Sequence, residues 1–154
     1  MLRNLLDLFA PAPPPKLSAV PDGTRYYVIG DIHGRLDLFE AMIIAIEGEI
    51  NAAPALDHRI ILLGDLIDRG PHSAGVVSRT RWWQQTRNVR VLAGNHEEMF
   101  LAAFEQPEAL RHFLKHGGDE TVMSYGFSKK QLATLELEEL FARLPEIVPE
   151  DVRD

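Results

Sequence analysis

Three short clusters of polar residues stand out because each one follows an apolar run. The first, Gly30–Gly34, places a carboxylate and an imidazole two residues apart, so both can reach one cation. The second, Gly64–Gly70, adds two carboxylates and a guanidinium, and the third, Gly94–Glu97, supplies an amide oxygen and a histidine. Carboxylates bind hard cations, a planar arginine suits phosphate oxygens, and a histidine can donate a proton. Together these types indicate metal-assisted hydrolysis of a phosphate ester.

Each cluster alone also has an ordinary structural interpretation. Gly30 and Asp31 could form a turn with a helix cap, and Asp68 and Arg69 could be a surface pair. His96 alone could be a hydrogen-bonded loop histidine. Three such clusters in one chain, each after a predicted strand, favour the interpretation as a metal site.

The apolar runs before the clusters predict three β-strands, at residues 26–29, 60–63 and 89–93. The first two are too continuous for a strand with one solvent face, and such runs are typical of strands covered on both faces. Between the strands, apolar residues at steps of three and four predict a helix from Asp37 to Ile50, and a second helix is predicted over Ser73–Trp83. This alternation predicts an α/β fold with largely parallel strands and crossover helices, so the three clusters meet at the carboxyl edge of the sheet.

The chain beyond the third strand is predicted to be helical. One helix should begin at Pro107 and stop at Gly117, and another should cover Leu137–Leu144 and end at Pro145. Residues 149–151 resemble the opening turn of one more helix, with acids at its amino end. We therefore expect the sequence to stop within an element.

The domain organisation is expected to be simple. Prolines between residues 11 and 15 predict an extended linker, so residues 1–24 form a Pro-rich segment. Residues 25–154 form one folded domain, which we expect to be truncated at its carboxyl end.

Composition narrows the class of partner. The 154 residues include 16 Lys and Arg against 23 Asp and Glu, a net charge of −7, which argues against nucleic acid. No apolar run approaches the roughly 20 residues that cross a bilayer, so no membrane partner is expected. The absence of cysteine excludes disulfides, thiolate zinc sites and a cysteine nucleophile, and it is compatible with the cytoplasmic location that we expect.

The three clusters resemble the first three signatures of the calcineurin-like metallophosphoesterases: Gly-Asp-x-His-Gly, Gly-Asp-x-x-Asp-Arg-Gly and Gly-Asn-His-Glu. The Asp-Arg-Gly and His-Glu endings are typical of the serine/threonine protein phosphatase branch. The later stretch His116–Gly126 also looks like the bacterial members, as a softer match. The resemblance implies the amino-terminal half of a metallophosphoesterase α/β sandwich.

The resemblance also implies a metal-ligand set. Asp31 and His33 would bind one metal, Asp65 would bridge two, and Asn95 would bind the second metal and lie near the substrate phosphate. The implied cofactor is a pair of divalent metal ions, with manganese expected and iron or zinc as alternatives. The family completes both sites with histidines from two later motifs, and neither motif occurs before Asp154.

The implied catalytic roles fall on three further residues. His96 would protonate the departing alkoxide, Asp68 would orient His96, and Arg69 would hold the phosphate. Family members often carry an arginine where Ala93 stands, so one phosphate contact is missing or comes from elsewhere. The pair His112 and His116 has a helical spacing that could bind zinc, but solvated helix histidines are the preferred interpretation.

The function implied is hydrolysis of phosphoserine and phosphothreonine, with a phosphorylated protein or peptide as the partner. One alternative is a symmetrical dinucleoside tetraphosphate hydrolase, which commonly ends the third motif in Asp rather than in Glu97. Another is a truncated, non-catalytic chain that binds a metal or a partner. The 154-residue chain alone is expected to have little activity, because its ligand set is incomplete.

Overall fold

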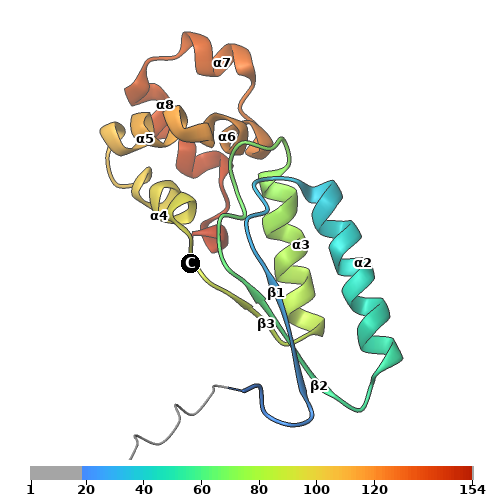
Figure 1. The fold of residues 1–154 in the computed structure, drawn as a ribbon. Helices are drawn as coiled ribbons and strands as arrows, with labels where there is room; N and C mark the ends of the chain where they lie inside the picture. Colours follow the sequence, from blue (N-terminus) through green and yellow to red (C-terminus); the bar gives the residue numbers. More distant parts are fainter. Residues whose placement is uncertain (1–18, 154) are drawn as a thin grey trace, which may run out of the picture.

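A three-stranded parallel sheet is the base of the structure, a computed structural model that describes residues 19–153 (Figure 1). The prolines predicted to form a linker at 11–15 lie outside the described residues. The strands are β1 (Thr24–Ile29), β2 (Asp57–Leu62) and β3 (Val89–Val91). They pair side by side in the order β1-β2-β3, and both pairings are parallel. The predicted α/β class and all three strands are thus confirmed, although β3 ends earlier than predicted.

Two helices cover one face of this sheet. They are α2 (Leu36–Ala52) and α3 (Ser73–Thr86), each the crossover between consecutive strands (Figure 1). Helix α2 buries Phe39, Ile43, Ile46 and Ile50, the apolar residues that repeat at steps of three and four. On the sheet, Ile60 and Leu62 of β2 are fully buried, which fits the alternation of side chains along a strand.

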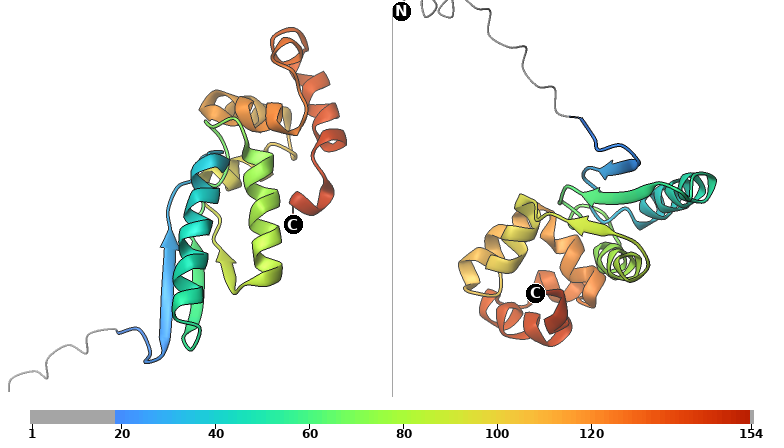
Figure 2. Two further views of the ribbon diagram at one scale, coloured as in Figure 1. Left: turned by 90° about the vertical axis from the view of Figure 1, so that its right-hand side faces the viewer. Right: turned by 90° about the horizontal axis from the view of Figure 1, so that it is seen from below.

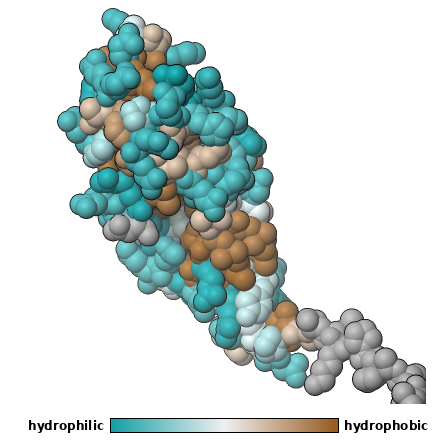
Figure 3. Space-filling model, turned by 90° about the vertical axis from the view of Figure 1, so that its left-hand side faces the viewer, coloured by the Kyte–Doolittle hydropathy of each residue, from teal (hydrophilic) through white to brown (hydrophobic). Residues whose placement is uncertain are grey.

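The opposite face of the sheet is open in the described part of the chain. Val28 is 56% exposed and Leu63 is 49% exposed. Val28 pairs with Ile61 in the sheet, and Leu63 lies two positions after Ile61, so both are on the face opposite Leu62. Figure 3 shows an apolar patch on the side of the molecule away from α2 and α3. The expectation that both faces of the sheet are covered was therefore wrong for residues 19–153. A continuous apolar run indicates that both faces need to be buried, but it does not show which segment buries them.

The remaining helices gather at the carboxyl ends of the strands (Figures 1 and 2). They are α4 (Asn95–Ala102), α5 (Pro107–Phe113), α6 (Asp119–Tyr125), α7 (Lys129–Thr134) and α8 (Leu137–Ile147). Their shared core includes Phe100, Phe113, Val122 and Leu144, all buried. This helical layer therefore lies at the sheet edge where the three polar clusters end.

Two prolines and a glycine were predicted to mark helix ends in this layer. Pro107 begins α5 as predicted, and Gly117, with φ +97°, lies at a kink in the π-helical turn Leu114–Gly118 that joins α5 to α6. The predicted stop at Pro145 was wrong, because α8 continues to Ile147. Pro145 removes only its own N–H from the helix, and Val148 N still donates to Leu144 O at 3.1 Å.

A short 3-10 turn, Glu150–Val152, follows Pro149 and agrees with the predicted opening turn. None of the helices within residues 19–153 combines the length and the apolar character needed to cross a membrane.

Candidate metal centre

Strained backbone marks the turns at the ends of β1 and β2. His33, Asp65, Asp68 and Arg69 have φ of 45°, 53°, 72° and 65°, and no other non-glycine residue between 19 and 153 has a positive φ. Such a conformation costs on the order of 1–3 kcal/mol for each residue and persists only where the surroundings hold it. All four residues belong to the site predicted from the sequence, so the fold concentrates its backbone strain there.

The first two turns are joined through their backbones. The N–H groups of Ile32 and His33 both donate to the carbonyl of Asp65, at 3.0 Å and 2.9 Å. Gly34 N donates to Leu66 O at 2.8 Å. These bonds bring the residues of the first cluster against those of the second, as the parallel order of β1 and β2 requires.

His33 has the arrangement of a metal-binding histidine. Its Nδ1 lies 2.9 Å from the carbonyl of Ile67, and a carbonyl only accepts, so Nδ1 carries the proton and Nε2 keeps a free lone pair. Nε2 is buried and has no hydrogen-bond partner in the described part of the chain. Metal-bound histidines typically donate their other N–H to a carbonyl in this way, so His33 fits a divalent cation.

Two carboxylates lie close to this free nitrogen. Asp31 Oδ2 is 3.8 Å from His33 Nε2, with a side chain that is 68% exposed. Ligand atoms of His33, Asp65 and His96 lie within 4.8 Å of one another. Oxygen and imidazole donors of this kind suit a hard or borderline divalent cation.

Among the predicted ligands, Asn95 has the side chain that the structure constrains least. It is exposed at the first position of α4, and its side chain makes no hydrogen bond to another residue between 19 and 153. The structure thus brings Asp31, His33 and Asp65 together and places Asn95 beside His96 in the chain. Their roles as metal ligands remain predictions.

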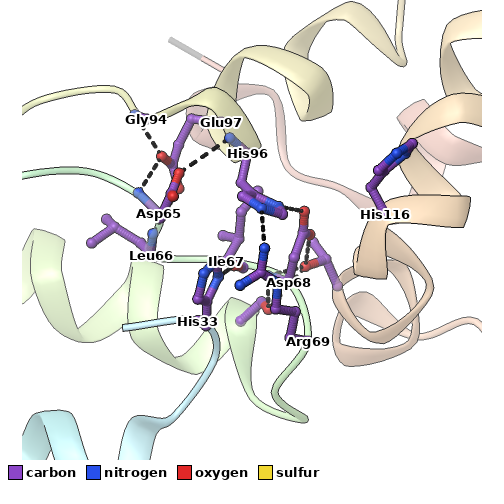
Figure 4. A network of polar contacts seen from close by, with 12 residues as sticks. His33, Asp65, Leu66, Ile67, Asp68, Arg69, Gly94, His96, Glu97 and His116 are labelled. Carbon is purple, nitrogen blue, oxygen red and sulfur yellow. Dashed lines mark hydrogen bonds and ion pairs between the residues drawn. The ribbon is translucent and has the colours of Figure 1, made fainter. Parts of the chain in front are cut away.

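His96 lies among these groups, yet both of its ring nitrogens are already engaged (Figure 4). Nδ1 is 2.6 Å from Asp68 Oδ2, and Nε2 is 3.0 Å from Nη2 of Arg69. Because a guanidinium only donates, Nε2 accepts and Nδ1–H donates to Asp68. His96 is therefore better suited to carry a proton than to bind a metal. This agrees with its predicted role, which remains a prediction.

Asp68 is the buried partner that holds His96. Its side chain has no exposed surface, and burial raises the pKa of its carboxyl, while hydrogen bonds from Thr121 and His96 act in the opposite direction. Its backbone N–H donates to Thr121 Oγ1 at 2.9 Å and to Ser73 Oγ at 3.1 Å.

Thr121, Ser73 and Glu97 take part in the site without a role predicted from the sequence. Thr121 falls within the softer match over His116–Gly126, and Glu97 closes the third signature. Both residues thus lie in stretches that resemble the family, but the resemblance gave neither a role. The pair His112 and His116 is exposed, with ring centroids 4.1 Å apart and His116 Nδ1 donating to His112 O. Their exposure agrees with their interpretation as solvated helix histidines.

Comparison with known families identifies the class of protein to which this fold and site belong. Residues 24–148 match the calcineurin-like phosphoesterase family, so the chain belongs to that family. Members of the family bind divalent metals.

Two kinds of curated relative are similar to this chain. A symmetrical bis(5'-nucleosyl)-tetraphosphatase from Acidovorax ebreus (strain TPSY) is 42% identical over 77 residues, which are 50% of this chain and 25% of the relative. Serine/threonine-protein phosphatase 2 from Escherichia coli (strain K12) is 35% identical over 95 residues, which are 60% of this chain and 38% of the relative. The matched region thus spans between a quarter and two fifths of the length of these relatives.

Proposed function

We propose that a protein carrying this chain hydrolyses phosphomonoesters, and that its substrate is phosphoserine or phosphothreonine in a protein or peptide. The observation that carries the proposal is the adjacency of two separate sets of groups. His33 presents a free Nε2 near the carboxylates of Asp31 and Asp65, and beside them His96 is held by Asp68 as a proton carrier. A phosphoesterase needs both functions at one point.

A pair of divalent cations, when bound, would acidify a water molecule and hold the phosphoryl oxygens. Asp31 and His33 would hold one cation, Asp65 would bridge, and Asn95 would hold the second. We propose manganese as the metal, with iron or zinc as alternatives.

Arg69 and His96 supply the remaining steps. In the structure Arg69 donates to His96 Nε2, the atom that must carry a proton to the leaving oxygen. A substrate phosphate would compete for the guanidinium, which binds phosphate oxygens through a planar fork. Once Arg69 turns to the phosphate, Nε2 of His96 is free to take and donate a proton, and Asp68 keeps the ring in place.

A second candidate substrate is a symmetrical dinucleoside tetraphosphate, which the relative from Acidovorax ebreus supports by its name. The Asp-Arg-Gly and His-Glu endings and the relative from Escherichia coli favour the phosphoprotein instead. A non-catalytic chain that binds a metal or a partner is the third possibility. The net charge of −7 supports a protein rather than a nucleic acid as partner, and we propose a cytoplasmic location without a membrane partner.

The test is a comparison of two substrates with the natural protein that contains this sequence. Manganese-dependent phosphate release from a phosphoserine peptide should exceed cleavage of diadenosine tetraphosphate. The Asp65→Asn variant serves as the inactive control. Faster cleavage of the dinucleotide would establish the second candidate, and no metal-dependent turnover of either would refute the enzymatic proposal.

A further inference from the structure

The carboxylate of Glu97 joins the second and third polar clusters. Its Oε2 accepts the backbone N–H of Asp65 at 2.7 Å and that of Gly94 at 2.8 Å. Its Oε1 accepts the N–H of Leu66 at 2.8 Å. Figure 4 shows the side chain between Asp65 and Gly94, pointing toward the turn that follows β2. Two oxygens of one side chain thus bind three backbone donors, from two turns that are some thirty residues apart in sequence.

The two turns that Glu97 joins lie in direct contact. A Cβ on Gly64 would collide with the backbone nitrogen of Gly94, and a Cβ on Gly94 would collide with the carboxylate of Asp65. His96 N also donates to Asp65 Oδ1 at 3.2 Å. The close approach therefore needs both glycines, and Glu97 accepts three backbone N–H groups at the contact.

The same bonds act on the strained residue in the site. Asp65 is left-handed, at φ 53°, and this turns its N–H and the next one, of Leu66, toward a single acceptor. Consecutive N–H groups arranged in this way form an anion-binding concavity. Charge-assisted bonds of this kind are stronger than neutral ones, so Glu97 can hold a backbone conformation that is otherwise costly.

We propose that Glu97 is a positioning residue for the metal centre. It fixes the turn that carries Asp65 against the turn that carries Asn95, and so sets the separation of two ligands before any metal binds. The inference rests on the proposed function only in assigning Asp65 and Asn95 as ligands. Partners that orient metal ligands typically contribute about 10- to 100-fold to metal affinity.

The reach of the side chain is part of the proposal. Aspartate at this position would keep the charge but lose one methylene, about 1.5 Å of reach, too little to bind both turns in this geometry. Glutamine would keep the reach but turn an NH₂ group toward one of the backbone donors. Both substitutions should therefore loosen the contact, for different reasons.

The experiment compares Glu97→Gln and Glu97→Asp with Glu98→Gln in the natural protein that contains this sequence. Glu98 is a matched control because it is exposed and lies in the same first turn of α4. Manganese affinity is measured by calorimetry and by electron paramagnetic resonance, at a temperature where every variant is folded. We expect about 10-fold weaker binding in both Glu97 variants and less than about two-fold change in Glu98→Gln.

A second readout follows the contact between the two turns without metal. Amide hydrogen exchange at Asp65, Leu66 and Gly94 should accelerate in both Glu97 variants and stay unchanged in the control. Unchanged manganese affinity in a folded Glu97 variant, or an equal loss in Glu98→Gln, would overturn the proposal. If the wild-type protein binds no manganese, the proposed metal centre fails, and hydrogen exchange alone tests the contact between the two turns. Faster exchange in the Glu97 variants then supports the positioning role, and unchanged protection overturns it.

Discussion

Thr121 and Asp68 lie 53 residues apart in the chain, yet Oγ1 of Thr121 donates to Oδ1 of Asp68 at 2.6 Å. The same hydroxyl accepts the backbone N–H of Asp68 at 2.9 Å. The other carboxylate oxygen of Asp68 is bound by His96. Helix α6 thus orients the buried acid from one side while the histidine engages it from the other, and the helical layer becomes part of the site.

Removal of this hydroxyl should destabilise the fold. Thr121→Val keeps the shape of the side chain but takes one donor from the buried carboxylate of Asp68, which costs about 1–3 kcal/mol when a buried polar group loses its partner. Thr121→Ser should retain most of the stability, because it keeps the hydroxyl. Urea unfolding of the two variants and the wild type checks this expectation. Equal stability of the Val variant would mean that Ser73 or water replaces the bond.

His96 should matter most for substrates with poor leaving groups. A general acid helps most when the departing oxygen is strongly basic, as in a serine alkoxide. In the natural protein, His96→Asn should therefore reduce hydrolysis of a phosphoserine peptide far more than hydrolysis of p-nitrophenyl phosphate. Steady-state rates on both substrates measure the difference. A uniform loss on both would point instead to a role in binding metal or phosphate.

The 154-residue chain should bind manganese weakly and at no more than about one site. Asp31, His33 and Asp65 can supply three donors to one cation, whereas a hard cation prefers about six and fills the rest with water. The second site would have only Asp65 and Asn95. In the natural protein, Asp65→Asn should lower the activity more than Asp31→Asn does, since the first removes a shared ligand. The number of sites in the 154-residue chain is measured by calorimetric titration. Two tight sites in the wild type would refute the ligand count.

The ion pair of Glu47 with Arg87 should make stability depend on pH. Glu47 on α2 also accepts Trp83 Nε1–H at 2.8 Å, so it links α2 to α3. The hydrogen bond from Arg87 lowers the pKa of Glu47 below its usual value. A lowered carboxyl pKa gives stability that is fully present above the unfolded value and is lost as the pH falls through the folded value.

Glu47→Gln should therefore lower the free energy of unfolding by about 1 kcal/mol at neutral pH, and the gap to the wild type should close in acid. Urea unfolding at a series of pH values checks this. Glu49→Gln is the matched control, because the pair of Glu49 with Arg25 is exposed and contributes little. A gap that stays constant with pH would show that shape, and not charge, sets the contribution of Glu47.

Some of the site could be predicted because its signals are local. Each cluster follows an apolar run, and parallel strands end at one edge, so residues such as Asp31 and Asp65 were expected to meet. Thr121 and Glu97 could not be assigned in this way. Their partners are backbone groups or lie far along the chain, and a threonine in a helix or a glutamate in a first turn is common.

The fold shows a similar division. Helix α2 follows from the spacing of its apolar residues, because one face must be buried. The passage of α8 through Pro145 does not follow, since a proline in the last turn loses only one bond and packing can continue the helix. The open face of the sheet marks the limit of such a prediction, because periodicity gives the polarity of a surface and not its neighbour.

The order β1-β2-β3 has a consequence for the path of folding. Each strand pairs with its nearest neighbour in sequence, so the parallel pairings join residues about 30 positions apart, such as Ile60 and Val89. The bond between Thr121 and Asp68 joins residues 53 positions apart and can form only when α6 docks against the assembled sheet and helices. We therefore expect the sheet to appear early and the orientation of Asp68 to appear last. Measured by φ-values, Ile60 should be high and Thr121 low, so the histidine–aspartate pair acquires its working geometry at the final step of folding.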